Sequence, residues 1–239
     1  MRAPSAAGAP VLGSQERFLE MYELGMWQAN CYILGDRTLQ RAVVVDPGQD
    51  AFQMVLERLA ANDVTCEAIL LTHGHLDHVW STPQLAEKLD VPVFLHPADR
   101  WLWDDPAKAF GNFPPGVLET QFGLTWHPTG DRLQDLRDGM RLTCAGMKVE
   151  VRHTPGHTPG SSVFLMRDGD PPVLLSGDLV FAGSVGRTDF PRGSFEEQND
   201  SLRRVVLPLD DETRVYSGHG PETTVGVERR TNPFLRALI

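Results

Sequence analysis

Short apolar runs separated by turn residues make up the first part of the chain. Apolar runs bounded by Gly, Pro, Asn or Asp are typical of β-strands, whereas apolar residues three or four positions apart are typical of helices. The pattern predicts strands at 18–24, 31–34, 42–45, 69–71 and 91–95. It predicts helices at 51–60, where Asp50 can cap the N-terminus, and at 83–89. This alternation of strands and helices indicates the α/β class.

The second part of the chain resumes the strand pattern after an irregular aromatic segment, 100–126. The rings of this segment are Trp101, Trp103, Phe110, Phe113, Phe122 and Trp126. Such a segment is typical either of a lid or binding loop, or of a surface excursion held in place by its aromatic rings, and the sequence leaves both open. Beyond it the pattern predicts strands at 140–151, 162–166, 173–175 and 214–216 and a helix at 195–206. No repeat or linker is visible, so we predict one domain over 15–239 after a disordered leader, 1–14, rich in small residues, Pro and Gly.

The composition disfavours several classes of protein. Of 239 residues, 41% are hydrophobic, which is enough for a buried core. A formal net charge of −10 and the lack of a basic run disfavour a nucleic-acid partner. We find no apolar stretch of the length of a signal peptide or a membrane span, and expect no membrane partner. The cysteines Cys31, Cys66 and Cys144 lie far apart, which favours buried, reduced thiols and a cytoplasmic location.

The segment 72–78, Thr-His-Gly-His-Leu-Asp-His, concentrates metal-binding side chains directly after a predicted strand. A single histidine is usually structural, but here three histidines and an aspartate fall within six residues. Imidazole and carboxylate ligands suit Zn²⁺ and also Fe or Mn, and the lack of cysteine argues against a closed structural zinc site. The spacing suits two ions: His73 and His75 can face one, while Asp77 and His78 face a second at the start of a helix.

Three later segments each end an apolar stretch with a turn that carries one further ligand-type residue, namely His157, Asp178 and His219. With the first cluster they form a complete dinuclear set. We predict that His157 joins His73 and His75 around one ion. His219 then joins Asp77 and His78 around the other, and Asp178 can bridge both ions.

Five motifs in this order resemble the metallo-β-lactamase superfamily, in particular its glyoxalase II (hydroxyacylglutathione hydrolase)-like branch. They are Val-Asp-Pro-Gly at 45–48, the 72–78 cluster, His-Thr-Pro-Gly-His-Thr at 153–158, Ser-Gly-Asp at 176–178 and Ser-Gly-His-Gly at 217–220, followed by Asn-Pro-Phe at 232–234. The resemblance implies a four-layer αββα sandwich with the metals at one edge and agrees with each ligand assignment. His96 and His153 also resemble fixed positions, which we interpret as supporting or structural residues.

The resemblance implies a basic contact to the thiol carrier of the substrate at Arg187. Its planar fork suits a carboxylate of the substrate, although it could instead pair with Asp189. Glyoxalase II continues after its last metal histidine with a helical glutathione-binding domain, whereas only 20 residues follow His219 here. We therefore expect another thiol or a broader thioester to be possible, with substrate contacts supplied by the 100–126 segment.

The leading hypothesis is hydrolysis of an acyl thioester of the S-2-hydroxyacylglutathione type by a metal-bridging hydroxide, which Asp77 orients. Persulfide dioxygenases of the superfamily share the Gly-Arg-Thr-Asp-Phe segment found at 186–190 and hold one iron, so an oxygenase is the alternative. A non-catalytic metal-binding scaffold is a third reading, but no ligand is missing. Nuclease activity is disfavoured by the acidic composition, and β-lactam hydrolysis by the Asp77–His78 pairing.

Overall fold

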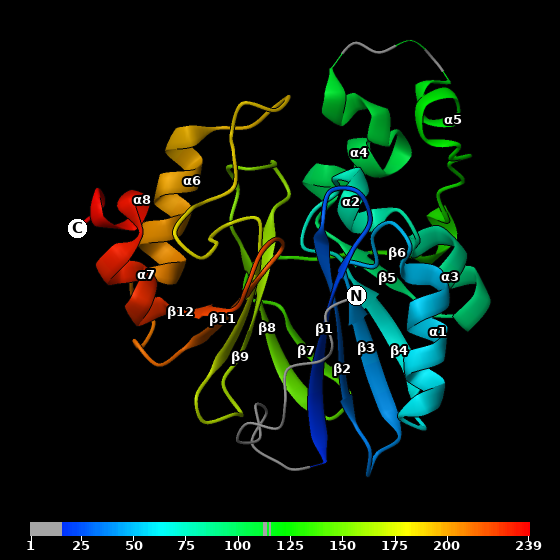
Figure 1. The fold of residues 1–239 in the computed structure, drawn as a ribbon, viewed down its shortest axis with the longest axis horizontal. Helices are drawn as coiled ribbons and strands as arrows, with labels where there is room; N and C mark the ends of the chain where they lie inside the picture. Colours follow the sequence, from blue (N-terminus) through cyan, green and yellow to red (C-terminus); the bar gives the residue numbers. More distant parts are fainter. Residues whose placement is uncertain (1–15, 112–113, 115) are drawn as a thin grey trace.

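The computed structural model describes residues 16–111, 114 and 116–239, so the predicted leader 1–14 lies outside the described residues. Two six-stranded sheets stand face to face in the described chain (Figure 1). The first sheet follows chain order, with β1 (Arg17–Leu24), β2 (Ala29–Asp36), β3 (Arg41–Val45), β4 (Thr65–Leu70), β5 (Val93–Leu95) and β6 (Leu133–Asp135). The second contains β7 (Arg141–Cys144), β8 (Met147–His153), β9 (Ser162–Met166), β10 (Val173–Gly177), β11 (Arg214–Ser217) and β12 (Thr223–Thr224).

Helices cover the outer face of each sheet, which confirms the predicted αββα sandwich (Figure 1). The first sheet carries α1 (Ala51–Ala61) and α3 (Thr82–Leu89). The second carries α6 (Phe195–Ser201), the π-helical turn η4 (Leu202–Val206), α7 (Val225–Thr231) and α8 (Pro233–Arg236). The remaining short helices are α2 (Leu76–Val79), η1 (Pro97–Asp99), α4 (Arg100–Asp104), η2 (Pro106–Phe110), α5 (Val117–Phe122) and η3 (Gly130–Arg132).

Strand alternation divides the core into layers. In β2, Ile33 packs towards α1 and α3, whereas its neighbours Tyr32 and Leu34 pack between the sheets. Phe164 of β9 meets them in this middle layer and is fully buried. Because successive strand residues point to opposite faces, a strand covered on both sides is buried throughout, and every residue of β2 is buried, with the apolar run 31–34 at its middle.

The segment 100–126 is more ordered than the sequence indicated. Within its described residues it forms α4, η2 and α5 rather than an irregular loop. These helices have five or six residues each, too short for an apolar periodicity to be recognised. Phe110 and Phe122 pack with Trp27 and Trp80 in a cluster of their own, so the rings order this segment. The prediction for Phe113 lies outside the described residues.

Three further features of the structure differ from the sequence-based predictions. The strand predicted at 140–151 is the hairpin β7–β8, which turns at Ala145 and Gly146, both with positive φ. The helix predicted at 195–206 changes to a π-helical turn at Leu202. Strands β6 and β12, with three and two residues, are too short to leave a pattern in the sequence.

The C-terminal helices are fastened to the loop after β10 by buried polar groups. Glu228 of α7 is 1% exposed and accepts hydrogen bonds from the Gly183 amide and the Thr223 hydroxyl. The Asn232 side chain donates to Glu228 and to the carbonyl of Ser184. The Asn-Pro-Phe motif therefore secures the segment around Gly183 against α7 and α8.

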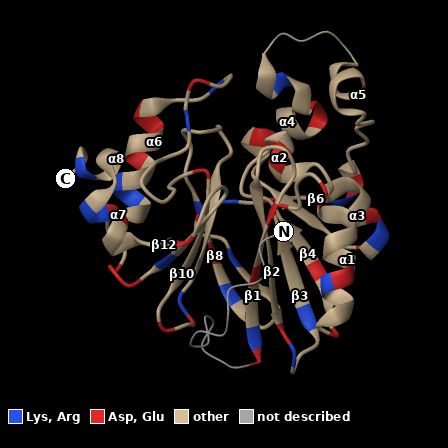
Figure 2. Cartoon of the chain, in the orientation of Figure 1, with Lys and Arg blue, Asp and Glu red and all other residues tan. Residues whose placement is uncertain are grey.

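Basic and acidic residues are interspersed over the helices and the strand ends (Figure 2). No helix within the described part of the chain is long and apolar enough to cross a lipid bilayer.

Replacing Phe164 with Ala tests the middle layer. Removal of a fully buried ring leaves a cavity between the sheets and should lower the free energy of unfolding by about 3–5 kcal/mol in chemical denaturation. Phe234→Ala removes a ring that is 38% exposed and should change it by less than about 1 kcal/mol. Equal losses in the two variants would contradict the assigned core.

Candidate metal centre

All seven predicted ligands converge at one edge of the sandwich. His73 and His75 follow β4, and Asp77 and His78 lie on α2. The remaining three follow strands of the second sheet, His157 after β8, Asp178 after β10 and His219 after β11. β3 to β6 run parallel to one another, as do β10 and β11, so the loops that follow these strands leave the sheets at common edges.

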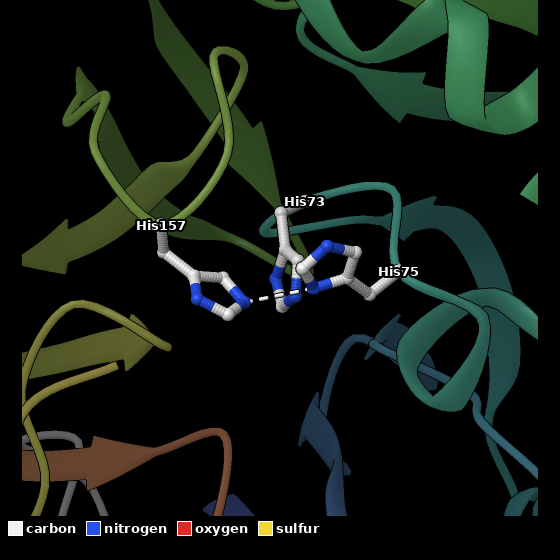
Figure 3. A group of neighbouring side chains, drawn as sticks. All are labelled: His73, His75 and His157. Atoms are coloured by element: carbon white, nitrogen blue, oxygen red, sulfur yellow. Dashed lines mark hydrogen bonds between the residues drawn. The ribbon is translucent and has the colours of Figure 1, made fainter. Parts of the chain in front are cut away.

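The first group consists of His73, His75 and His157, whose ring nitrogens lie within 4.8 Å of one another. Figure 3 shows the three rings pointing towards one another from two different loops. The His157 Nε2 atom is 2.8 Å from the His75 Nδ1 atom. All three histidines are buried, which fits a ligand set held away from bulk solvent.

The second group consists of Asp77, His78 and His219. The Oδ2 atom of Asp77 is 3.5 Å from His78 Nε2 and 3.2 Å from His219 Nε2. The two Nε2 atoms are 3.3 Å apart. One carboxylate oxygen and two imidazole nitrogens therefore face a common point.

Asp178 lies between the two groups. Its Oδ2 atom is 3.4 Å from His157 Nε2 of the first group and 3.7 Å from His219 Nε2 of the second. Its Oδ1 atom is 3.6 Å from His78 Nε2. This is the position expected of a bridging carboxylate, and Gly218 makes it possible because a Cβ there would overlap Asp178 Oδ1.

Two buried polar atoms of the cluster test whether metal ions fit. His73 Nε2 and Asp178 Oδ1 are inaccessible to solvent and have no hydrogen-bond partner among the described residues. Leaving a buried polar atom without a partner costs about 1–3 kcal/mol, so native proteins rarely do so. Both atoms face the other candidate ligands, and a divalent cation would satisfy them. The donor set therefore fits metal ions.

The ionisation of the cluster reflects a shortage of positive charge. Burial lowers the pKa of His73 and His75, which keeps these imidazoles neutral and able to coordinate. Burial also acts to lower the pKa of His78, but the neighbouring Asp77, Asp178 and Asp46 outweigh it and raise the pKa to about 10. The three carboxylates thus stabilise positive charge around His78, and this charge can come from protons or from metal ions.

In three of the histidines the Nδ1 atom contacts an oxygen of the protein, so that the Nε2 atom points into the cluster of candidate ligands. The Nδ1 atom of His157 lies 2.7 Å from the carbonyl of Arg187, and that of His219 lies 3.2 Å from the carbonyl of Gln28. The Nδ1 atom of His78 lies 3.1 Å from Asp46 Oδ2. Such outer contacts fix the tautomer and the orientation of metal-binding histidines.

Asp46 is a site residue to which the sequence assigned no role. It is 1% exposed and accepts hydrogen bonds from the amide and the hydroxyl of Thr72 as well as contacting His78. Its oxygen also lies near His73 and His78, but the contact is to the Nδ1 side of His78, away from Asp77 and His219. We therefore assign Asp46 to orienting His78. An aspartate at the end of a buried strand, before Pro-Gly, was the available signal.

Asp99 also escaped the sequence analysis. It is fully buried and accepts hydrogen bonds from the Gly74 amide, between His73 and His75, and from Thr158 and Gly160 on the loop of His157. The carboxylate therefore ties together the two loops that carry the first ligand group. No local pattern marks it, because its partners are at least 25 residues away in sequence.

His96 and His153 stand outside the ligand groups, as expected. Their rings are stacked with centroids 3.9 Å apart, and His153 Nε2 lies 2.8 Å from the carbonyl of Pro159. Burial and the neighbouring His153 lower the pKa of His96 to about 4. The pair therefore braces the loop that carries His157.

Arg187 lies at the pocket but already has a partner. Its Nε and Nη2 atoms each donate to Asp189 at 2.6 Å, and its guanidinium lies 4.3 Å from the centre of the Phe190 ring. The pairing of Arg187 with Asp189 is thus present, and the role of Arg187 in substrate binding stays a prediction. The pocket has a volume of about 360 Å³ and opens onto His75, Asp77, His157, Asp178 and His219.

The fold, the ligand set and sequence comparison together define the family. Residues 24–219 match the family model of the metallo-beta-lactamase superfamily, so the chain belongs to this superfamily of metallo-hydrolases. It is 42% identical to the Mycobacterium leprae protein ML0493 over 217 residues, covering 91% of this chain and 98% of that protein. It is 33% identical to the hydroxyacylglutathione hydrolase GloC of Haemophilus influenzae over 220 residues, covering 92% of this chain and 98% of that protein.

Solved structures resemble the chain over most of its length. The B3 metallo-beta-lactamase BLEG-1 is 35% identical with a TM-score of 0.77, covering 91% of this chain and 99% of its own. The protein TTHA1623, solved in a di-iron-bound form, is 38% identical with a TM-score of 0.75, covering 90% and 99%. ETHE1 from Myxococcus xanthus is 25% identical with a TM-score of 0.71, covering 92% and 89%.

Asp99→Asn tests the link between the two ligand loops. An amide group has one acceptor oxygen where the carboxylate has two, so at least one buried backbone N–H loses its partner. We expect the free energy of unfolding to fall by about 1–3 kcal/mol in denaturant titration. Asp90→Asn, whose carboxylate is 86% exposed in a pair with Arg132, is the control and should change it by less than about 1 kcal/mol. An unchanged stability of Asp99→Asn would remove this role.

Proposed function

We propose that the chain is a metal-dependent hydrolase of acyl thioesters, of the S-2-hydroxyacylglutathione type or with a related thiol. The observation that carries the proposal is the position of Asp178, between two complete groups of three ligand-type residues at the base of a pocket. The similarity to a hydroxyacylglutathione hydrolase along nearly the whole chain supports the choice of a thioester. The net charge of −10 and the interspersed positions of basic and acidic residues along the chain (Figure 2) favour a small-molecule substrate over nucleic acid.

In this proposal two divalent ions, zinc or iron, are held by the seven residues. His73, His75 and His157 would bind one ion, Asp77, His78 and His219 the other, and Asp178 both. Zinc suits imidazole and carboxylate ligands, and the di-iron form of a similar protein supports iron equally. Bound metal ions would supply a lowered pKa for water and polarisation of the thioester carbonyl.

The protein side chains would orient the reactants. Asp77 lines the pocket with one oxygen towards His78 and His219, so its carboxylate can accept a hydrogen bond from the attacking water and direct it. The anchored rings of His78 and His157 would hold the ligand geometry without rearrangement during the reaction. A thiolate leaves readily because thiols have a pKa of about 8.5, so no separate acid is needed.

Mononuclear-iron persulfide dioxygenation is the second candidate. It is favoured by the 186–190 segment, whose Phe190 ring lies 5.1 Å from the His75 ring and so forms part of the pocket wall. The second ligand group, which one iron would leave unused, favours the hydrolase. A preparation with a single iron and production of sulfite from glutathione persulfide would establish the dioxygenase instead.

Metal content tests the ligand assignment. We expect two metal ions per chain by elemental analysis of protein purified without chelator, and about one in His219→Ala, which removes a ligand from the second group only. His127→Ala removes an exposed histidine outside both groups and should keep two. One ion in the unmodified protein, or no loss in His219→Ala, would contradict the dinuclear proposal.

Activity tests the reaction. S-Lactoylglutathione and other acyl thioesters should be hydrolysed by metal-loaded protein, with thiol release followed by a chromogenic reagent. Asp77→Asn should lower kcat/KM by about 100-fold or more, because the amide loses the charge that faces His78 and His219. Asp131→Asn, at an exposed position on η3, should retain full activity. Absence of turnover across the whole panel would refute the proposal.

A further inference from the structure

The pocket wall beyond the candidate ligands is almost entirely apolar. Arg187 is its one polar side chain outside the ligand set, among the described lining residues. The others are Trp27, Leu76, Ala109, Phe110, Phe181, Val185 and Phe190. Any part of a substrate that extends from the reacting group therefore meets mainly hydrocarbon and aromatic rings.

Trp27 is the largest of these side chains, and its ring packs against three other aromatic rings. It lies in the turn between β1 and β2, with its ring 6.3 Å from that of Phe110 in a stacked arrangement. Phe122 meets it edge-on at 5.3 Å, and Trp80 lies at 6.2 Å. Trp27 and Phe110 both line the pocket and are only partly buried. A ring fixed in this way offers contact area at little cost in conformational entropy.

The charges of the wall give little attraction for an anionic carrier. Arg187 directs two N–H groups to Asp189, and both side chains are more than 60% exposed. The pair is neutral overall and in contact with water, where ion pairs are weak. Glutathione carries two carboxylates, and no lysine or second arginine side chain lines this pocket in the described chain.

We infer that Trp27 and Phe110 form a binding site for an apolar group of the thioester, an aliphatic chain or an aromatic ring next to the reacting bond. This inference rests on the proposed thioesterase function and specifies its substrate class. Burial of each methylene against these rings contributes to binding in proportion to the area removed from water. The apolar group can belong to the acyl side or to the thiol side, and the two are separated by experiment.

Two series of thioesters test the inference on metal-loaded protein. In one, the acyl group lengthens from acetyl to hexanoyl on N-acetylcysteamine, an uncharged thiol. In the other, the acetyl group is fixed and the alkane thiol lengthens from ethyl to hexyl. We expect kcat/KM to rise about threefold per methylene in one of the two series, which identifies the side that contacts the rings. No rise in either series would overturn the inference even if every compound is hydrolysed.

Variants connect the length dependence to the rings. Trp27→Ala and Phe110→Ala should each flatten the responding series, whereas Phe234→Ala, on α8 and outside the pocket, should keep its slope. The same slope in all three variants would overturn the assignment. If a pocket variant fails to fold, the two series on unmodified protein and the remaining variant still decide the question.

Binding of a compound that cannot be hydrolysed separates this inference from the proposed function. S-Hexyl-N-acetylcysteamine, a thioether, should bind metal-loaded protein in calorimetry with a Kd about tenfold weaker in Trp27→Ala than in Phe234→Ala. Binding without turnover of any thioester would remove the proposed function but leave the apolar site. Turnover with no binding difference between the variants would remove the apolar site alone.

Discussion

Three carboxylates and five imidazole rings share a space in which the protein does not supply enough hydrogen-bond partners for all of them. The deficit is visible in the buried His73 Nε2 and Asp178 Oδ1 atoms and in the raised pKa of His78, where the carboxylates Asp77, Asp178 and Asp46 outweigh the effect of burial. Such a cluster is unfavourable for folding in isolation, because desolvated charge must be compensated. Its presence at the edge of an otherwise apolar sandwich indicates that the scaffold holds these groups in place for cations.

That requirement accounts for the rigid polar contacts around the cluster. Asp99 joins the loops of the first ligand group, and Asp46 holds His78 through its second nitrogen. Glu228 and Asn232 secure the loop after β10 from the far side. Each of these side chains is buried and has hydrogen-bond partners in distant parts of the chain, whereas His73 Nε2 and Asp178 Oδ1 at the centre have none among the described residues.

The seven candidate ligands could be selected from the sequence because histidines and aspartates recur directly after predicted strands or in the 72–78 cluster, and the structure brings these side chains together. The strand 162–166 was predicted with its correct bounds because its apolar run is bounded by turn residues. Asp99 and Asp46 could not be assigned roles, because an aspartate has many uses and the partners that define its role are brought together only by the fold. The helices within 100–126 were missed because tertiary packing of Phe110 and Phe122 orders them, rather than any local periodicity.

The position of Trp27 has a consequence for how the protein can change over evolution. The candidate ligands lie on α2 and on the loops that follow β4, β8, β10 and β11, whereas Trp27 and Phe110 lie on a hairpin turn and on η2, which are separate segments of the chain. Turn and loop segments accept substitution and insertion more readily than strands. Under the proposed function, changes confined to the hairpin turn and η2 could therefore alter which compound binds while the segments that carry the candidate ligands stay the same.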